Sequence, residues 1–600
     1  MTKKTVSGAK ESGALACHAF NRLIAGYIKT CAQQPDKTAF VIEGLEFTYA
    51  DLALAEETAS LWLQSQAKNN GLPCSSLRVA CRLNNGFELA VWYLASIRNH
   101  CLFVLMDPTW SSAELTHAIE NTLPDVLIES VQCGQISESV DTCFAFAPRL
   151  DYGNTCTGTE LPLARWLDTN TLIRQTTPRD DLFLSGFTSG SSGKPKAFVR
   201  TAESWLASFQ VSADEFGTCG DSVILAPGPL SHGLSFFALA ETFYHGATFV
   251  SRGSYNAGTC CEFLLKGFVL SHCLTTVVLV PSMLSGILDA VEEKRSDAPD
   301  MTPVNDSANI HVITAGAKLS TSQKERFIRH FPRMRLSEYY GASELSFVSV
   351  GHLTEQPPPD SVGRICKGVS ARTRPEPDGV GLHGVGLIEV AGPLLASGYL
   401  RRINNRQVVE EITGDDGYAT VGDCGYFDEA GYLYLVDRED RMFNSGGLKV
   451  FPSRVEQIAT DYFRNDCDYN NDHHDHYDHC GKAVETCAVV ALDDSFWGQR
   501  VCLVLHNAES TQHRDQDWID ALLSHCRSNL QRHEVPRVVV AVDQLPMTTS
   551  GKIAYHQLAT QLLNSLPAEI RTDDLLQSGT TSPDAFGAQV CRWLYDADKA

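Results

Sequence analysis

The sequence predicts an α/β fold, with a large N-terminal domain of parallel or mixed sheets layered with helices and a small C-terminal α+β domain. Three observations support this prediction. The chain has 600 residues, which is more than one hydrophobic core usually organises. Strand-like apolar runs bounded by Gly and Pro alternate with helix-like stretches, as in proteins built on parallel sheets. From residue 417 onward this pattern of strand-like and helix-like stretches changes, and a run of charged residues at 437–440 predicts a domain boundary.

The elements of the predicted large domain are strands separated by helices. The expected strands are 222–226, 275–280 and 310–313, and the expected helices are 282–293 and 321–330. A further strand is expected at 432–436, and for the small domain we expect strands at 485–492, 501–505 and 535–542 and helices at 451–462 and 517–530. Nothing in the chain repeats at a fixed period, so a solenoid or other repeat architecture is not expected.

The domain limits follow from these elements. We expect a large domain at 1–436 with residues 1–15 flexible, a hinge at 437–440, a small domain at 441–570 with an insertion at 466–480 rich in His and Asp, and a C-terminal tail at 571–600. The tail is rich in Asp, Ser and Thr, so we expect it to fray in part.

Composition and charge limit the classes of function. Hydrophobic residues make up 43% of the chain and charged residues 20%, which is ordinary for a globular enzyme and unlike a disordered chain. The net charge of -23 argues against a general affinity for nucleic acid or for an anionic membrane surface. An anionic substrate would therefore need a local positive pocket.

Cysteine usage and the N-terminus bear on the cellular compartment. The 20 cysteines are scattered without a compact framework, so we expect reduced thiols rather than a disulfide scaffold. The basic residues near the N-terminus precede no apolar segment, and no apolar run is long enough to cross a bilayer. We therefore expect a cytoplasmic protein with no membrane span.

The segment 188–196, TSGSSGKPK, is the most informative in the chain. Small residues allow backbone N–H groups to point at an anion, hydroxyls add donors, and two lysines supply positive charge. The P-loop pattern requires Ser or Thr after Gly-Lys, whereas Pro195 follows Lys194, so the ordinary P-loop reading fails. A flexible Ser/Gly linker is the alternative, but a strand-like run at 182–184 directly precedes the segment. We interpret the segment as a phosphate-holding loop.

This loop resembles the signature loop of the adenylate-forming (AMP-binding) superfamily, which includes acyl-CoA synthetases, peptide-synthetase adenylation domains and beetle luciferases. The resemblance implies that ATP is a substrate and that its phosphates contact Thr188, Ser189, Gly190, Ser191, Ser192, Gly193, Lys194 and Lys196.

A second motif, 339–344, resembles the Tyr-Gly-x-Thr-Glu motif of the family, with Ser343 in place of the usual Thr. The resemblance implies that Tyr340, followed by Gly341, stacks on adenine and that Glu344 binds Mg²⁺. An aromatic face suits a base, and a hard carboxylate suits Mg²⁺ that bridges phosphates. On its own the motif would equally fit a surface turn with a solvated Glu.

Two further motifs concern the ribose and the hinge. Asp423 lies where the family has a carboxylate that accepts hydrogen bonds from both ribose hydroxyls, and such a charged acceptor suits a vicinal diol. Arg438 lies where the family has a second ribose contact, and Asp440 lies at the family's hinge. Either residue alone would also fit a surface charge.

The C-terminal part carries two more family motifs. The segment 444–452, with Lys449, resembles the stretch that acyl-CoA synthetases bring to the active site after adenylation. The segment 545–553 resembles the motif with the catalytic lysine, which is Lys552 here. A positive charge near the attacking carboxylate and the α-phosphate would stabilise the transition state. The motifs run in family order from about residue 40 to residue 555, nearly the whole chain.

Two other patterns are weaker. The segment 379–384 matches G-x-G-x-x-G, but no strand is expected before it and no helix after it, so we interpret it as a turn. The insertion at 466–480 contains His473, His474, His476 and His479, which could chelate a transition metal. Clustered His and Asp in a polar insertion are more often solvated, and we expect an accessory role.

The resemblance implies a function in two steps. A carboxylic acid is first adenylated by ATP, and the acyl group then passes to a thiol. Lys552, Glu344, Ser343 and His232 are the expected catalytic residues. The segment 228–237 contains His232 and resembles the acyl-CoA synthetase form of a motif near the acyl pocket; it lacks the Asp that pairs with an amino-acid substrate. A fatty or aryl acid is therefore favoured.

The thiol acceptor is expected to be coenzyme A or the phosphopantetheine of a separate carrier protein. One alternative function is a stand-alone adenylation enzyme that loads such a carrier in secondary-metabolite or siderophore biosynthesis. A non-catalytic nucleotide sensor is an alternative of another class, but it would not need the Lys552 motif.

Overall fold

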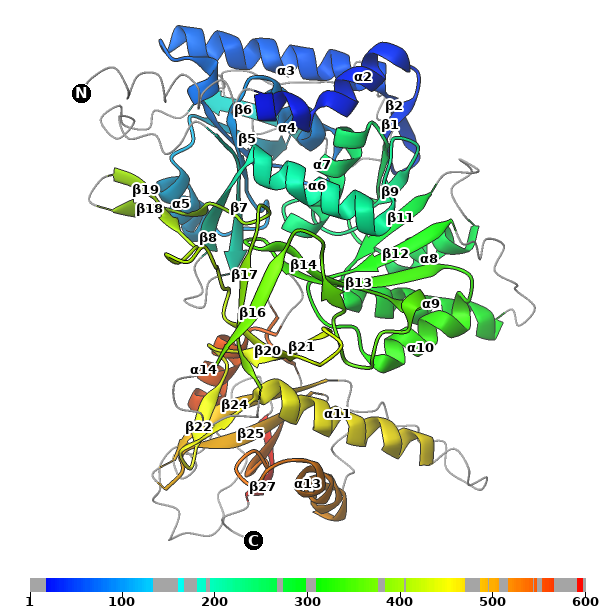
Figure 1. Ribbon diagram of the computed structural model, residues 1–600, viewed down its shortest axis with the longest axis vertical. Helices are drawn as coiled ribbons and strands as arrows, with labels where there is room; N and C mark the ends of the chain where they lie inside the picture. Colours follow the sequence, from blue (N-terminus) through cyan, green and yellow to red (C-terminus); the bar gives the residue numbers. More distant parts are fainter. Residues whose placement is uncertain are drawn as a thin grey trace. The chain divides into compact units, whose positions relative to one another are not determined.

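The structure is a computed structural model, shown as a ribbon in Figure 1. It describes residues 18–132, 160–166, 181–189, 195–266, 274–297, 309–375, 384–403, 406–469, 486–494, 496–506, 516–542, 544–547, 553–565 and 591–596. The chain forms two compact units. Unit 1 contains residues 1–372, 389–421 and 428–434, and unit 2 contains 373–388, 422–427 and 435–600. The division predicted at 437–440 stays a prediction.

Unit 1 contains a nine-stranded mixed sheet. Its strand order is β15 (Arg364–Ile365), β14 (Ser346–His352), β13 (Arg335–Ala342), β12 (Ile310–Thr314), β11 (Thr275–Leu279), β9 (Val223–Leu225), β10 (Thr248–Ser251), β1 (Thr38–Ile42) and β2 (Leu45–Thr48). The strands from β13 to β1 are parallel to one another, and the edge strands pair antiparallel. The expected strands at 222–226, 275–280 and 310–313 are confirmed as β9, β11 and β12.

The second large sheet of unit 1 has eight strands. Its order is β19 (Arg406–Glu411), β18 (Gly398–Ile403), β8 (Pro195–Thr201), β7 (Leu182–Ser189), β4 (Leu102–Leu105), β3 (Arg78–Arg82), β5 (Val126–Gln132) and β6 (Glu160–Trp166). Strands β7, β4, β3 and β5 are parallel, whereas β7 and β8 form an antiparallel hairpin.

The helices of unit 1 cover these sheets. They are α2 (Ala25–Gln33), α3 (Tyr49–Asn69), α4 (Phe87–Arg98), α5 (Ser112–Thr122), α6 (Ala202–Phe216), α7 (Gly233–His245), α8 (Ala257–Lys266), α9 (Pro281–Asp297) and α10 (Thr321–His330). Three of them begin with a capping box, in which the N-cap hydroxyl and the side chain three residues on satisfy two free backbone N–H groups. These pairs are Thr48 with Asp51, Ser111 with Glu114, and Ser320 with Gln323.

The core of unit 1 follows from the two-residue period of its strands, because successive side chains of a strand point to opposite faces. Phe40 and Ile224 belong to a large cluster that also takes residues from the eight-stranded sheet and from α3, α4, α6 and α7. Their neighbours Val41 and Val223 belong to a second cluster with α8, α9 and α10. Figure 1 shows these three helices beside the strands of the nine-stranded sheet. Both faces of that sheet are therefore buried.

Unit 2 is built on a four-stranded sheet with helices on both faces. The sheet order is β24 (Cys487–Asp494), β25 (Gly498–His506), β26 (Val538–Val542) and β27 (Cys591–Asp596). Val489 and Leu503 pack with α11 (Pro452–Tyr469) and α13 (Gln516–Asn529), whereas Val490 and Val504 pack with α14 (Tyr555–Ser565). The alternation along each strand thus divides the core into two layers.

A third sheet has four strands. Its order is β16 (Ser370–Pro375), β17 (Gly386–Ala391), β20 (Asp423–Phe427) and β21 (Leu433–Arg438). A short hairpin of β22 (Phe443–Ser445) and β23 (Leu448–Val450) follows in unit 2.

Within the predicted tail, residues 591–596 form β27, which pairs antiparallel with β26. Two expectations need correction. The segment 379–384 was expected to have no strand before it, but β16 ends four residues earlier, at Pro375. A strand also follows it, as β17, so the dinucleotide-site interpretation still fails because no helix follows. The helix expected at 451–462 continues to Tyr469 and takes in the start of the predicted insertion.

The predicted fold class is confirmed as a mixed α/β protein with a large N-terminal sheet domain and a small C-terminal domain. No helix among the described residues is long and apolar enough to cross a membrane. The cysteines whose side chains are described are free thiols.

Candidate active site

The predicted phosphate loop connects the two strands of the β7–β8 hairpin. In this hairpin Thr188 pairs with Lys196 and Ser189 pairs with Pro195. The predicted contacts Gly190, Ser191, Ser192, Gly193 and Lys194 lie outside the described residues, as does the side chain of Ser189. The hairpin therefore holds Thr188 and Lys196 opposite each other at the two ends of the loop.

Glu344 lies beside this hairpin. Its carboxylate oxygen Oε1 accepts hydrogen bonds from Thr188 Oγ1 at 3.0 Å and from the Tyr399 hydroxyl at 2.7 Å. The side chain is buried, and burying a carboxylate is costly unless it is hydrogen-bonded or paired. The Nζ atom of Lys196 lies 5.9 Å from the ring centroid of Tyr399. Two hydroxyl donors thus converge on the predicted magnesium ligand, and Lys196 lies over the ring of one of them.

Tyr399 was not predicted from the sequence. It lies on β18, more than 50 residues after Glu344, and a lone tyrosine in a strand carries no motif. One signal could have drawn attention to this segment: Gly398 has φ of 153°, and a Cβ there would lie 2.2 Å from the backbone oxygen of Glu410. A glycine inside a strand often marks such a close approach of two backbones.

Tyr340 and Gly341 lie at the end of β13, at an irregularity in its pairing with β14. A Cβ at Gly341 would lie 2.0 Å from the backbone oxygen of Ser346, so no other residue fits without moving the backbone. Tyr340 is buried, and Tyr339 packs on Phe347 with ring centroids 4.6 Å apart. This packing fixes the strand that leads into Glu344.

Ser343 lies close to Gly233, the residue that follows His232. His232 precedes α7, and a Cβ at Gly233 would lie 3.2 Å from Ser343 Oγ. The His232 ring nitrogen Nε2 lies 3.1 Å from Asp107 Oδ2. Burial raises the pKa of the Asp107 carboxyl, but the hydrogen bonds from His232 and Thr109 outweigh this effect and lower the pKa to about 2.

Asp107 is a second residue that the sequence analysis missed. It lies two residues after the end of β4, and functional groups often follow the carboxyl ends of parallel strands in open α/β sheets. Its two oxygens have different partners, because Oδ1 accepts from the backbone and hydroxyl of Thr109 at 2.8 and 2.6 Å and Oδ2 faces His232. Asp107 therefore fixes the orientation of the His232 ring.

Asp423 and Arg438, the predicted ribose contacts, both lie in unit 2. The backbone N–H of Glu439 donates to the Gly422 carbonyl at 2.7 Å, which holds the two segments side by side. The Arg438 side chain contacts Asp440, the predicted hinge residue, through Nε at 3.0 Å and Nη2 at 3.2 Å. Both side chains are largely exposed, so this ion pair contributes little stability.

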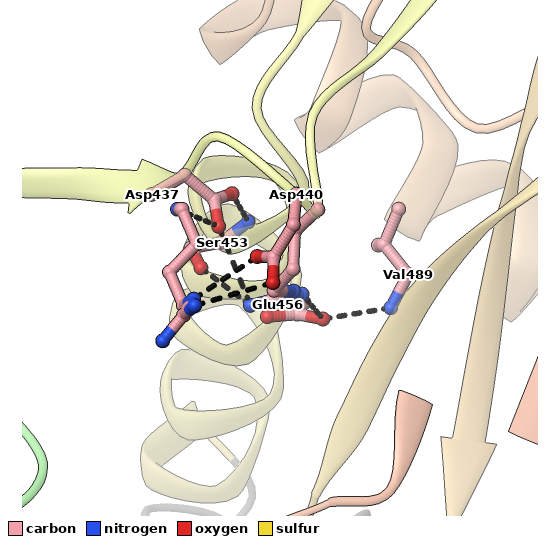
Figure 2. Close-up of polar contacts among 7 residues, drawn as sticks. Asp437, Asp440, Ser453, Glu456 and Val489 are labelled. Carbon is pink, nitrogen blue, oxygen red and sulfur yellow. Dashed lines mark hydrogen bonds and ion pairs between the residues drawn. The ribbon is translucent and has the colours of Figure 1, made fainter. Parts of the chain in front are cut away.

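The residues that flank Asp440 are anchored within unit 2, as Figure 2 shows. Asp437 Oδ2 accepts from the Ser453 N–H at 2.6 Å, at the start of α11. Arg441 Nη2 donates to Glu456 Oε1 at 2.7 Å, and the same oxygen accepts from the Val489 N–H at 2.8 Å. Burial raises the pKa of Glu456, and the Arg441 guanidinium opposes this effect. This cluster joins the predicted hinge segment to the helix and sheet of unit 2.

Lys449 lies on β23, in the hairpin whose turn contains Gly446 and Gly447. Both glycines have left-handed φ angles, of 61° and 78°. The Lys449 carbonyl accepts from His533 Nε2 at 2.8 Å, and the Gly446 N–H donates to the Trp497 carbonyl at 2.8 Å. The hairpin is therefore held firmly against its neighbours in unit 2.

Lys552 lies outside the described residues. On either side of its segment, Met547 and Ile553 pair as an isolated antiparallel bridge, and the Ala554 N–H donates to the Pro546 carbonyl at 2.7 Å. The four histidines of the predicted insertion also lie outside the described residues. Among the residues that the structure does describe, no group of three or more His, Cys, Asp and Glu side chains is arranged to hold a metal ion.

Unit 1 thus places a buried glutamate beside the hairpin that holds Thr188 and Lys196. The family model of AMP-binding enzymes matches residues 28–400, and that of the AMP-binding enzyme C-terminal domain matches residues 481–552. The chain belongs to the AMP-binding enzyme family.

Curated relatives cover nearly the whole chain. The uncharacterized acyl–CoA ligase YhfT of Bacillus subtilis is 27% identical over 551 residues, which are 90% of this chain and 98% of the relative. The putative long chain fatty acid-CoA ligase VraA of Staphylococcus aureus is 25% identical over 531 residues, 88% of this chain and 96% of the relative. The predicted resemblance to acyl-CoA synthetases is confirmed, and with it the prediction of an AMP-forming ligase.

Solved structures support the fold. ATP-bound MatB from Rhodopseudomonas palustris has a TM-score of 0.68 and 18% identity, and the match covers 92% of this chain and 99% of that one. The o-succinylbenzoate CoA synthetase MenE from Bacillus subtilis, in complex with its acyl-adenylate, has a TM-score of 0.65 and 19% identity, with 89% of this chain and 97% of that one covered. At these identities the likeness concerns the fold alone.

Proposed function

We propose that the chain is an acid–thiol ligase that makes an acyl-AMP from a carboxylic acid and ATP and then transfers the acyl group to coenzyme A. The observation that carries this proposal is the convergence of the Thr188 and Tyr399 hydroxyls on Glu344, with Lys196 over the Tyr399 ring, in a chain of the AMP-binding enzyme family. The names of the relatives, as acyl–CoA and long chain fatty acid-CoA ligases, support a thioester product.

In the first half-reaction, a carboxylate oxygen of the substrate attacks the α-phosphorus of ATP. An oxygen–phosphorus bond forms, the bond to the β-phosphate bridging oxygen breaks, and pyrophosphate leaves. This reaction needs positioning and charge stabilisation more than a nucleophilic side chain. Lys552 would stabilise the charge that shifts between the attacking carboxylate and the α-phosphate. Asp423 and Arg438 would hold the ribose, and Tyr340 would stack on adenine.

The donor set at Glu344 fits Mg²⁺. The residue offers a hard carboxylate oxygen, which Mg²⁺ prefers, and its Oε1 atom is already oriented by two hydroxyl groups. When bound, the ion would neutralise charge on the phosphates of ATP. Thr188 and Tyr399 keep the carboxylate in one orientation for this contact.

A fatty or aryl acid is the proposed substrate class. The helix that follows His232 carries Phe236 and Phe237, and the Phe237 ring lies 5.2 Å from that of Phe347, three residues after Glu344. An apolar, aromatic environment close to the site favours an apolar acyl group over an amino acid. His232, held by Asp107, would face this group.

The second half-reaction would use a different arrangement of the small domain. We propose that rotation about Asp440 withdraws Lys552 and presents Gly446, Gly447 and Lys449 for attack of the thiol on the acyl carbonyl. Replacing Asp440 by Pro fixes φ at this residue and should slow thioester formation more than adenylate formation. Asp440→Ala is the matched control, because it removes the carboxylate but keeps the backbone free. Equal loss of both half-reactions in the Pro variant would contradict the rotation.

The test of the function is pyrophosphate release from Mg·ATP with a panel of fatty, aryl and amino acids, with and without coenzyme A. Release with one acid class, a thioester with coenzyme A, and loss of both in Lys552→Ala are the expected results. Release without transfer to coenzyme A would favour a carrier-protein acceptor. Absence of release with every acid would contradict the proposed function.

A further inference from the structure

Arg200 is a buried cation close to the candidate site. It lies on β8, four residues after Lys196, and its side chain is among the largest that are fully buried in the described chain. Taking a guanidinium out of water is expensive unless its N–H groups find partners. Burial lowers the pKa of Arg200 to about 10, and the charge of Glu344 opposes this effect. The side chain is therefore still a cation at neutral pH.

The hydrogen bonds of Arg200 go to two segments that are far apart in sequence. Its Nε donates to the Ser343 carbonyl at 3.1 Å, and its Nη1 donates to the Leu394 carbonyl at 2.8 Å. Nη1 also donates to Ser204 Oγ at 3.2 Å. The planar fork of an arginine can hold two carbonyls in a fixed relation, which the single ammonium of a lysine cannot do.

Both of these segments hold Glu344. Ser343 directly precedes it, and the segment after Leu394 binds it twice. The Ala396 N–H donates to the Glu344 carbonyl at 2.8 Å, and the Tyr399 hydroxyl donates to its carboxylate at 2.7 Å. The glutamate therefore depends on the relative position of two segments, and Arg200 joins them.

We propose that Arg200 is a positioning residue for Glu344: its guanidinium joins the carbonyls of Ser343 and Leu394 and so fixes the carboxylate in the orientation that binds the metal ion of Mg·ATP. The part of this inference that concerns the metal rests on the proposed function. None of these three hydrogen bonds of Arg200 goes to the Glu344 carboxylate. The proposed role is therefore to hold the two backbone segments in place.

The experiment measures the affinity of the full-length protein for ATP by titration calorimetry, with and without Mg²⁺. The ratio of the two dissociation constants is the magnesium effect. We expect Arg200→Lys and Arg200→Met to reduce this effect about tenfold or more, which corresponds to roughly 1.4 kcal/mol, and to leave the affinity for metal-free ATP unchanged. The Met variant serves as the second substitution because it leaves no unpaired charge in the interior.

Arg78→Lys is the matched control. Arg78 is another buried arginine of unit 1, and its Nη1 lies 3.4 and 3.5 Å from the carbonyls of Thr122 and Leu123. The same substitution there should leave the magnesium effect intact. Glu344→Gln should abolish the effect, and the double variant Arg200→Lys/Glu344→Gln should lose no more than Glu344→Gln alone, because both act through one group.

The possible results separate the two proposals. A full magnesium effect in either Arg200 variant, or additive losses in the double variant, would overturn the positioning role. Retention of the effect in Arg200→Lys with loss in Arg200→Met would show that charge matters rather than geometry, and would overturn it as well. A wild-type protein that adenylates an acid but shows no magnesium effect would also overturn it. An intact pattern of magnesium effects without adenylation of any acid would overturn the proposed function only.

Discussion

Glu241 allows a sharp test of the packing around α7, the helix that begins beside His232. Its carboxyl is buried among helices α6 and α7, and one of its oxygens has no hydrogen-bond partner within the described structure. Burial raises its pKa to about 8 from 4.5, although a hydrogen bond with Ser212 lowers it somewhat. The perturbation is Glu241→Gln, which keeps the size of the side chain and removes its ionisation.

The magnitude follows from the two pKa values. Between pH 4.5 and about 8 the folded protein keeps a proton that the unfolded chain releases, so stability falls as pH rises through this window. Above about pH 8 both states are ionised and the effect levels off. Each pKa unit corresponds to 1.36 kcal/mol, so the wild type should lose about 4 kcal/mol relative to Glu241→Gln between pH 5 and pH 9.

The assay compares thermal unfolding midpoints of the wild type and Glu241→Gln at several pH values from 5 to 9. The difference between the two midpoints should widen up to about pH 8 and then stay constant. Glu203→Gln, on α6 with a side chain that is 62% exposed, is the control and should run parallel to the wild type. Parallel profiles for Glu241→Gln and the wild type would refute the argument from burial.

Three further predictions concern the site and the hinge. Tyr399→Phe removes a charge-assisted hydrogen bond to Glu344 and should lower the kcat/KM of adenylation about 10- to 100-fold; unchanged kinetics would contradict it. Gly341→Ala places a Cβ 2.0 Å from the Ser346 backbone oxygen, and should lower the free energy of unfolding by about 1–3 kcal/mol and reduce activity. A variant with the wild-type thermal midpoint and rate would contradict this prediction. Glu456→Gln breaks a buried ion pair in unit 2 and should destabilise that unit by about 3 kcal/mol, as measured by chemical unfolding; a stable variant would show that the pair contributes little.

The sequence indicated those candidate site residues that lie in continuous motifs. Thr188 and Glu344 were chosen from separate motifs, and the structure joins them by a hydrogen bond. A loop rich in glycine and hydroxyl residues can be recognised in a sequence because its residues are adjacent in the chain. Helices such as α10 were predictable for the same reason, since a capping box and an amphipathic pattern are local.

The residues that support the motifs were not predictable in this way. Tyr399, Asp107 and Arg200 belong to common residue types, and their partners lie 55, 125 and 143 residues away. Only the fold brings these pairs together. The strand β27 was missed for a related reason. Its pairing with β26 is a tertiary contact, and the residues that flank it in the tail are largely polar. Tertiary context decides such elements more than local propensity does.

The central claim is that the carboxylate of the substrate attacks the α-phosphate of ATP, and isotope transfer tests it most directly. The acid that gives the fastest pyrophosphate release is supplied with both carboxylate oxygens labelled with ¹⁸O, together with coenzyme A, and the products are examined by mass spectrometry. Attack on the α-phosphate predicts one ¹⁸O atom in AMP and none in pyrophosphate. Label in inorganic phosphate with ADP as the nucleotide product would contradict the account, because it would mean attack at the γ-phosphate.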